Sequence, residues 1–185
     1  MMMKFKEYNN KLNESVEDLE KIFGDKFSDF ALQLSAYIDY NDKDSADELL
    51  NYYPELKKAG LIESPKVLYR LVRLERISDY KINSQQVTSA SKKRFPPSFL
   101  KDMKKMVNQW KKTGKFYCLI ITDAKGLDVN KLYKVFKGKK RYLIKKYDTL
   151  GNMNFDVLYD SFENKKYQKE FIIFGDYKVK DLILV

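Results

Sequence analysis

Pro65 separates two kinds of apolar spacing, and this change constrains the fold more than any other feature of the sequence. Ahead of Pro65, apolar residues recur at helical spacing. The segment "SVEDLEKIFG" begins at a capping residue, Ser15, and stops at Gly24, while "KFSDFALQLSAYI" keeps its apolar residues on one helical face. Both segments therefore predict amphipathic helices.

Two shorter helices are expected to complete the first third of the chain. The segment "DSADELLNYY" offers a capping box of Ser45 and Glu48, and Pro54 is expected to end its helix. A short turn of helix then leads to Gly60. We therefore expect residues 10–60 to form a small helical layer.

The remainder of the chain has the pattern of strands. "KVLYRLVRLE", "QQVTSAS", "KFYCLIIT" and "RYLIKKY" each predict one strand, and the closing stretch "YQKEFIIFGDYKVKDLILV" predicts two. One long helix, "PSFLKDMKKMVNQWKKTG", opens at Pro96 and Pro97, whereas "DTLGNMN" and "DSFENKK" are rich in turn formers and predict loops. Short strands with a single long helix among them favour an α+β fold with a mainly antiparallel sheet.

The net charge changes sign at the same point. Residues 1–63 carry 8 Lys and 14 Asp or Glu, a net charge of −6, whereas residues 64–185 carry 28 Lys or Arg and 12 acids, a net charge of +16. We expect a helical layer over residues 1–63, in the same domain as a β-rich core over residues 64–185. A basic core favours a polyanionic partner such as nucleic acid, but a solvated lysine-rich surface gives the same count, and both interpretations stay open.

Several classes of site and compartment are disfavoured by the composition. Histidine is absent, which excludes an imidazole base, and with Cys118 as the one cysteine a zinc site is not expected. Cys118 lies in the apolar run "FYCLII", where we expect the thiol to pack as a small hydrophobe. The absence of a disulfide framework, of a signal peptide in "MMMKFKEYNN" and of a membrane-spanning run predicts a cytoplasmic protein with no membrane partner.

Polar groups interrupt otherwise apolar strands at three places. Arg70 lies inside the first strand, "TSAS" (Thr88–Ser91) closes the second, and "QKE" (Gln168–Glu170) opens the penultimate one. Because alternate side chains of a strand share a face, Gln168 and Glu170 point the same way. A carboxylate at the head of an apolar strand costs several kcal/mol unless it finds hydrogen-bonding partners, so Glu170 is either at the wet end of the strand or placed for chemistry.

Four segments carry a family resemblance in the same order. They are "VLYR" (67–70), "VTSAS" (87–91), "FYCLIITDAKGLDV" (116–129) and "YQKEFIIFGDYKV" (167–179). With these segments the chain resembles the mono-ADP-ribosyltransferases of the Arg–Ser–Glu group, which includes clostridial Rho-modifying exoenzymes and phage-encoded transferases. The resemblance extends from about residue 66 to the end. It implies an ADP-ribosyltransferase-like fold with a mainly antiparallel sheet core, and NAD as the co-substrate without a metal.

The resemblance implies a role for each interrupting residue. Cleavage of the nicotinamide–ribose bond of NAD develops positive charge on the ribose, and a carboxylate beneath that ribose, Glu170, would stabilise the charge. Arg70 would bind the phosphates of NAD through paired N–H groups, with Tyr69 beside it in the cofactor-binding set. Ser89 would orient the glutamate, and Ser91 would support the local turn.

The residue two before the glutamate relates to the acceptor in this family. Glutamine at that place, here Gln168, accompanies acceptors other than arginine, because an amide both donates and accepts hydrogen bonds. Phe162 and Tyr167, in the segment ahead of it, are the candidate acceptor contacts. One departure is that Ala90 stands between the serines where many members have threonine.

Two functional interpretations remain. The first is a monomeric transferase, a phage effector or toxin acting in the host-cell cytoplasm, that passes ADP-ribose to a protein side chain or a nucleic-acid base. The second is a non-enzymatic RNA- or DNA-binding protein, suggested by interleaved aromatic and basic residues such as "KVFKGKKRYLIKKY". In a purely structural interpretation, Arg70 pairs with an acid of the helical layer and the serines cap a turn.

Overall fold

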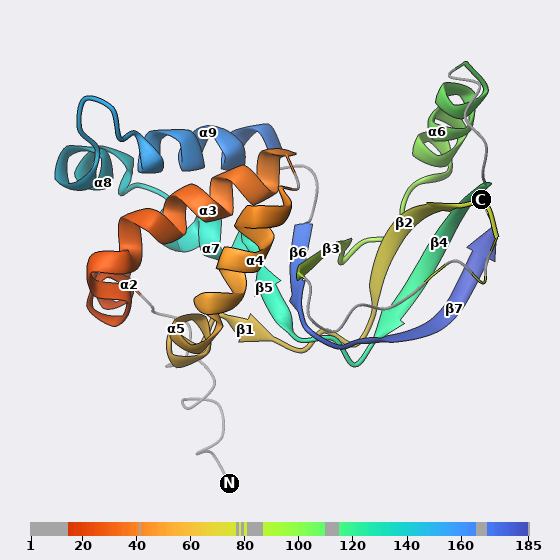
Figure 1. Cartoon of the computed structure of the whole chain (residues 1–185), viewed down its shortest axis with the longest axis horizontal. Coiled ribbons are helices and arrows are strands. Elements are labelled where there is room, and N and C mark those ends of the chain that lie inside the picture. The colour runs from red at the N-terminus through yellow and green to blue at the C-terminus, as the bar shows by residue number, and fades with distance from the viewer. Residues whose placement is uncertain are drawn as a thin grey trace, which may run out of the picture. The chain divides into compact units, whose positions relative to one another are not determined.

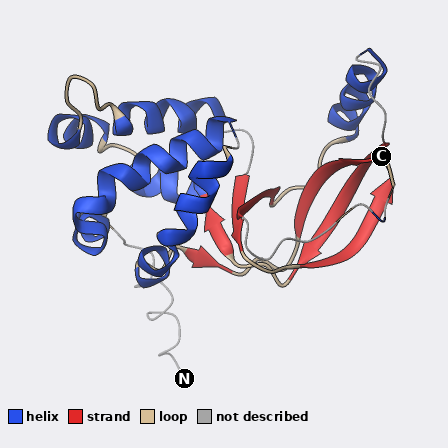
Figure 2. Ribbon diagram, in the orientation of Figure 1, coloured by secondary structure: helices blue, strands red, loops and turns tan. Residues whose placement is uncertain are grey.

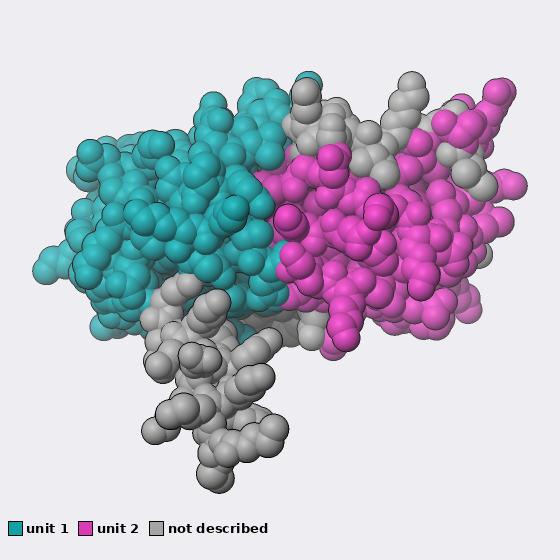
Figure 3. Space-filling model, turned by 90° about the horizontal axis from the view of Figure 1, so that it is seen from below, with its two compact units in different colours: residues 1–63, 127–167 teal, residues 64–126, 168–185 magenta. Residues whose placement is uncertain are grey.

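The computed structural model describes residues 15–40, 42–76, 78, 80, 87–109, 115–165 and 170–184. The chain forms two compact units, which Figure 3 shows in different colours. Unit 1 comprises residues 1–63 and 127–167, and unit 2 comprises residues 64–126 and 168–185. The first division thus falls where the charge changes sign, whereas residues 127–167, which we expected in the β-rich core, belong to the unit that contains the early helices.

Unit 1 is built mainly from helices (Figures 1 and 2). Its first stretch forms α2 (Val16–Phe23), η1 (Gly24–Lys26), α3 (Phe27–Tyr40), α4 (Lys43–Asn51), α5 (Tyr53–Lys58) and the short strand β1 (Ile62–Glu63). Its second stretch continues β5 (Gly126–Asp128) into α7 (Val129–Phe136), α8 (Lys140–Tyr147) and α9 (Asn154–Lys165). Helices thus occupy most of residues 16–58, where the sequence predicts them, and three further helices belong to the same unit.

The N-terminal cap of α2 is the one predicted from the sequence, whereas the N-terminal cap of α4 is a different residue. Ser15 caps α2 as expected: its side chain accepts the amide hydrogen of Asp18 at 3.2 Å, and Gly24 ends the helix. The capping box at Ser45 is wrong, because Asp42 caps α4 and accepts the amide hydrogen of Ser45 at 2.8 Å. Aspartate one turn earlier satisfies the exposed amides of the first turn, so the helix begins before Ser45.

Two elements of residues 127–167 also differ from the prediction. The segment "RYLIKKY" forms helix α8 rather than a strand. Tyr142 and Lys146 of this helix, and Lys139 at its N-cap, lie three and four residues apart, and each donates a hydrogen bond to a glutamate of α2, Glu17 or Glu20. Only helical spacing brings these three side chains to one side, which explains why the helix prevails. The segment "DSFENKK", expected as a loop, lies largely within α9.

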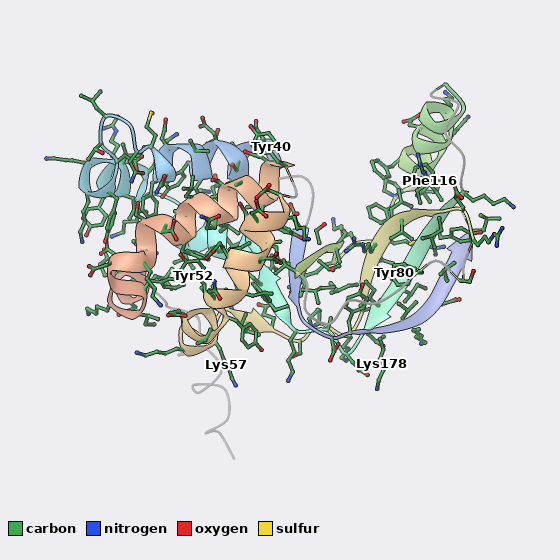
Figure 4. All side chains as sticks on the ribbon, viewed as in Figure 1. Tyr40, Tyr52, Lys57, Tyr80, Phe116 and Lys178 are labelled. Atoms are coloured by element: carbon green, nitrogen blue, oxygen red, sulfur yellow. The ribbon has the colours of Figure 1, made fainter. Side chains whose placement is uncertain are left out.

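Aromatic rings form the core of unit 1. Phe27 of α3 lies 6.0 Å from Phe136 of α7 and 5.2 Å from Phe155 of α9, measured between ring centroids. Phe162 of α9 packs against Phe136 at 6.0 Å. In Figure 4, Tyr52 marks the α4–α5 junction of this unit, where its hydroxyl bonds the Asp29 carboxylate. Burial of aromatic rings on α3, α7 and α9 thus holds the two stretches of unit 1 together.

Unit 2 contains an antiparallel sheet. Its elements are β2 (Leu68–Leu74), β3 (Val87–Ser91), α6 (Pro97–Gln109), β4 (Lys115–Thr122), β6 (Glu170–Phe174) and β7 (Lys178–Leu184). The strands lie in the order β6-β3-β2-β4-β7, and each neighbouring pair is antiparallel. The α+β fold class is therefore confirmed.

The two faces of this sheet differ in burial. One face, here called the core face, carries a cluster of buried apolar side chains, namely Leu68, Ala90, Leu119, Ile121, Phe171 and Ile173. The opposite face, here called the serine face, carries side chains of which several are only partly buried, namely Tyr69, Leu71, Ser89, Ser91, Ile120 and Glu170. The assignment follows from strand pairing, since directly opposed residues share a face and neighbours in one strand alternate. Ile172 and Cys118 of the serine face are buried, whereas Ser89, Ser91 and Glu170 are partly exposed, so a ligand can reach the part of this face formed by these three residues.

Gly126 allows close packing at the edge of unit 2. A Cβ atom built on Gly126 would lie 2.0 Å from the carbonyl oxygen of Ile172 and 2.6 Å from the Phe171 ring. Glycine is therefore required where the end of the "DAKG" turn passes β6. Within the ranges given above, none of the helices combines the length and the apolar character needed to cross a bilayer.

Candidate active site on the serine face

Three of the predicted site residues lie in one row across the sheet. Tyr69 of β2 pairs with Ser91 of β3, and Ser91 pairs with Glu170 of β6. Directly opposed residues of antiparallel strands have Cβ atoms about 5 Å apart, so the side chains of Ser91 and Glu170 are immediate neighbours. The three separated sequence signals therefore come from three adjacent strands.

Ser89 lies on the same face one pair further along. It is opposite Ile172, which makes Ser89 a diagonal neighbour of Glu170, about 7 Å away between backbones. A serine hydroxyl at that distance is within reach of a longer side chain such as glutamate.

The hydroxyl of Ser91 is committed to the turn that follows β3. It accepts the amide hydrogen of Lys93 at 3.1 Å and donates to the carbonyl oxygen of Lys93 at 2.8 Å. A hydroxyl has a single proton to donate, so Ser91 has none left for the carboxylate opposite. Of the two serines, Ser89 is the one whose position suits a hydrogen bond to Glu170, and Ser91 orders the turn.

Glu170 begins β6 and is half-buried, although the strand behind it is fully buried. One of its carboxylate oxygens, Oε2, is inaccessible to solvent. Glu170 is the first residue of its strand and lies on the serine face, so its carboxylate is at the boundary between the sheet and solvent. A carboxylate so placed can meet a ligand without leaving its strand.

Arg70 does not share the face of Glu170. It pairs with Leu119, a residue of the core face, and lies one residue from Tyr69 in the strand. Its guanidinium Nη1 donates to the backbone carbonyl of Ser89 at 3.5 Å. The structure thus brings Arg70 to the strand of the serines but on the other side of the sheet, and does not bring its guanidinium together with the carboxylate.

Arg70 is instead near a pair of tyrosines on the core face. The hydroxyls of Tyr80 and Tyr177 are 2.5 Å apart, and Figure 4 shows Tyr80 beside the strands of unit 2. Burial, together with the hydrogen bond to Tyr177, raises the pKa of Tyr80, while the positive charge of Arg70 acts in the opposite direction. Arg70 therefore adds charge to a largely apolar environment that packs β2 against the β6–β7 connection.

The acceptor contacts predicted from the sequence divide into two cases. Phe162 is wrong as an acceptor contact: it is 2% exposed and packs against Tyr133 and Phe136 in unit 1. The reason is that its segment is helical, and the apolar side of that helix faces the core. Gln168 and Tyr167 lie outside the described residues.

One group of surface residues was missed by the sequence analysis. Directly after Ser91 come Lys92, Lys93 and Arg94, followed by Phe95 and, one helical turn later, Phe99. The ammonium of Lys92 lies 5.2 Å from the ring centroid of Phe171, the neighbour of Glu170 in β6. A run of three cations ahead of two aromatic residues is the signal that could have identified this surface.

The thiol of Cys118 lies on the serine face, opposite Leu71. Its side chain is buried, and burial raises the pKa of the thiol, with the charge of Arg94 opposing that change. Cys118 is therefore a packing residue.

Among the residues that the structure describes, no group of three or more carboxylate or thiol side chains is gathered so that it could hold a metal ion. The chain was also compared with models of known protein families, with curated proteins and with solved structures, and none of them matches it.

Proposed function

We propose that this protein is a mono-ADP-ribosyltransferase that cleaves the nicotinamide–ribose bond of NAD, with Glu170 as the catalytic carboxylate. The single observation that carries the proposal is the register of β3 and β6, in which Glu170 is opposite Ser91 and diagonal to Ser89 on a partly exposed face. A carboxylate beside serine hydroxyls at the end of a buried strand suits a role that needs a fixed negative charge.

The chemistry requires that charge at one point. As the bond between ribose C1′ and nicotinamide breaks, the electron pair leaves with nicotinamide and positive charge develops on the ribose. Glu170 stabilises this charge, and Ser89, its diagonal neighbour, orients the carboxylate once NAD is bound. The acceptor nucleophile then attacks C1′ and releases its proton to solvent, or water attacks and NAD is hydrolysed.

Arg70 is the residue to which the phosphates of NAD would bind according to the family resemblance. Its position on the core face, however, does not support a direct contact with a dinucleotide whose ribose is at Glu170. The proposal therefore rests on Glu170 and Ser89, and Arg70 is tested on its own.

For the acceptor we propose a group other than arginine. The support is Gln168, which the sequence places two residues before Glu170. An amide can pair with another amide or with the edge of a base, whereas a carboxylate there would favour a guanidinium. The Gln168→Ala variant should lose transfer while it keeps NAD hydrolysis.

The test is nicotinamide release from NAD by purified protein. Glu170→Gln should slow release by about 100-fold or more, because the fixed charge is lost while the shape is kept. Glu163→Gln, which removes an exposed carboxylate from α9, is the matched control and should leave the rate unchanged. Normal turnover in a folded Glu170→Gln variant, with folding verified by circular dichroism, would remove the proposed function.

A further inference from the structure

Positive charge is concentrated in one of the two units. Unit 2 contains 18 Lys or Arg and 7 Asp or Glu, a net charge of +11. Unit 1 contains 18 Lys or Arg and 19 Asp or Glu, a net charge of −1. The unit that carries Glu170 therefore holds the charge that a polyanion would recognise.

Part of the positive charge of residues 127–167 is paired with acids inside unit 1. Lys131, Lys139, Lys140 and Lys146 form ion pairs with acids of unit 1, namely Glu63, Glu17, Asp156, Asp160 and Glu20. Their charge is largely neutralised within the unit. In the segment "KVFKGKKRYLIKKY", which suggested a nucleic-acid-binding face, Lys139, Lys140 and Lys146 are paired in this way, whereas Lys134, Lys137, Arg141 and Lys145 are exposed. The segment belongs to a unit whose net charge is −1, so its exposed cations are balanced by acids of the same unit.

The connection from β3 to α6 is different. Lys93 and Arg94 are exposed, as is Lys101 on α6, and these three form no ion pair with any residue that the structure describes. Their charge is available to a partner in solvent.

Two aromatic rings accompany these cations. Phe95 and Phe99 have ring centroids 5.5 Å apart and are inclined by 19°, so they are stacked. Phe99 is 41% exposed. Pro96 and Pro97 between them restrict the backbone, and α6 begins at Pro97, so the outer ring is presented by a fixed support.

We infer that this surface, which we call the KRF surface (Lys93, Arg94, Phe95, Phe99 and Lys101), binds single-stranded nucleic acid. Cations track the phosphates of a single strand, and an exposed aromatic ring stacks on its bases without regard to sequence. The ring of Phe95 beneath Phe99 makes that platform rigid. A duplex, whose bases are already stacked, could use the cations but not the ring.

The KRF surface begins next to the strand that pairs with Glu170. The Ser91 hydroxyl fixes the backbone of Lys93, and Ser91 is opposite Glu170. The KRF surface thus starts two residues beyond the serine that is opposite Glu170. On the proposed function, on which this second step depends, the bound strand is the acceptor of ADP-ribose.

Binding is measured by fluorescence anisotropy with a labelled 20-nucleotide RNA, the DNA of the same sequence and a DNA duplex, at several salt concentrations. Both single strands should bind with a strong salt dependence, and the duplex should bind more weakly. Phe99→Ala should weaken single-strand binding by about 10-fold. The double variant Lys93→Glu and Arg94→Glu should weaken it further and reduce the slope of log affinity against log salt by about 1.4 or more.

Matched controls come from unit 1. Leu150→Ala removes a fully exposed apolar side chain, and Lys145→Glu reverses an exposed charge on α8. Neither should change binding. Equal loss of affinity in Lys145→Glu and in the double variant, unchanged affinity in Phe99→Ala, or equal binding of duplex and single strand would each overturn the inference.

Glu170→Gln separates the inference from the proposed function. This variant should bind the oligonucleotides normally and should fail to transfer label from NAD to them. Single-strand binding without any NAD cleavage by the wild-type protein would overturn the proposed function and leave the KRF surface as a plain binding site. NAD cleavage that never places label on an RNA or DNA strand would overturn the acceptor role alone.

Discussion

Arg70 donates a hydrogen bond from its guanidinium to the backbone carbonyl of Ser89, 3.5 Å away, from the face of the sheet opposite to Glu170. The contact joins β2 and β3 where a single residue pair, Tyr69 with Ser91, defines their register. Arg70 thus holds together the two strands that carry Tyr69 and the serines, which is a structural role.

We therefore expect Arg70→Lys to lower the free energy of unfolding, by about 1 kcal/mol, because a shorter and differently shaped cation loses the bond to the carbonyl. The Michaelis constant for NAD should change little. Urea unfolding and nicotinamide-release kinetics on the same preparation test both statements. A raised Michaelis constant with unchanged stability would instead return Arg70 to the phosphate-binding role that the family resemblance gives it.

The two serines should behave differently. Ser89→Ala should slow nicotinamide release by about 10-fold or more with little change in stability, because Glu170 loses the diagonal neighbour that we propose orients it in the complex with NAD. Ser91→Ala should destabilise the protein by about 1 kcal/mol or less and leave the rate nearly unchanged, because its hydroxyl bonds Lys93 rather than the carboxylate. The opposite pattern, with the larger kinetic effect in Ser91→Ala, would argue against Ser89 as the positioning residue.

The sequence predicted the strands of unit 2 well, because alternation and apolar runs are local signals. It also indicated which polar residues interrupt them. It could not predict that Glu170 is opposite Ser91, because this register depends on pairing between β3 and β6, which are far apart along the chain. The sequence also could not predict on which face of the sheet the Arg70 side chain lies, because the family resemblance assigns Arg70 a role but does not say to which face its side chain points.

The error at "RYLIKKY" has a similar origin. Leu143 is the buried residue of α8, so either an alternating or a helical arrangement could place one apolar residue inward. What favours the helix is the set of bonds from Lys139, Tyr142 and Lys146 to Glu17 and Glu20, all contacts between distant parts of the chain. Tertiary contacts of this kind leave no local trace in the sequence.

Cys118 should be unreactive in the folded protein. Its side chain is 6% exposed, and burial raises the pKa of the thiol, so little thiolate is present at neutral pH and reagents have poor access. Reaction with Ellman's reagent at pH 7.5 should be slow in buffer and stoichiometric in guanidinium chloride. Rapid reaction of the native protein would contradict the burial of the Cys118 side chain.

The ion pair between Glu17 and Lys139 should make unit 1 sensitive to acid. The Lys139 ammonium, 2.5 Å from Glu17 Oε1, lowers the pKa of that carboxyl from 4.5 to about 2. Since the folded-state pKa is the lower one, this stabilisation is fully present above pH 4.5 and is lost as the pH falls towards 2. The melting temperature of Glu17→Gln should therefore lie below that of the wild type at pH 7 and approach it near pH 2. Glu163→Gln is the control and should match the wild type at both values, and a constant difference for Glu17→Gln across the range would exclude the linkage.

Gly126 should be among the least replaceable residues of unit 2. A methyl group at this position would overlap the carbonyl oxygen of Ile172, which is backbone and cannot rotate away, so the "DAKG" turn or β6 must move. We expect Gly126→Ala to cost about 1–3 kcal/mol of stability, as overpacking does. Because Ile172 lies two residues from Glu170 in the same strand, nicotinamide release should also fall in the fraction that remains folded.

Gly24→Ala is the matched control. The methyl group of the alanine would meet open space, so only the positive φ of 56° at the end of α2 opposes the change. We expect it to cost about 1 kcal/mol of stability and to leave catalysis unchanged. Thermal unfolding and kinetics of the two variants, compared side by side, would contradict the packing argument if Gly126→Ala proved as mild as Gly24→Ala.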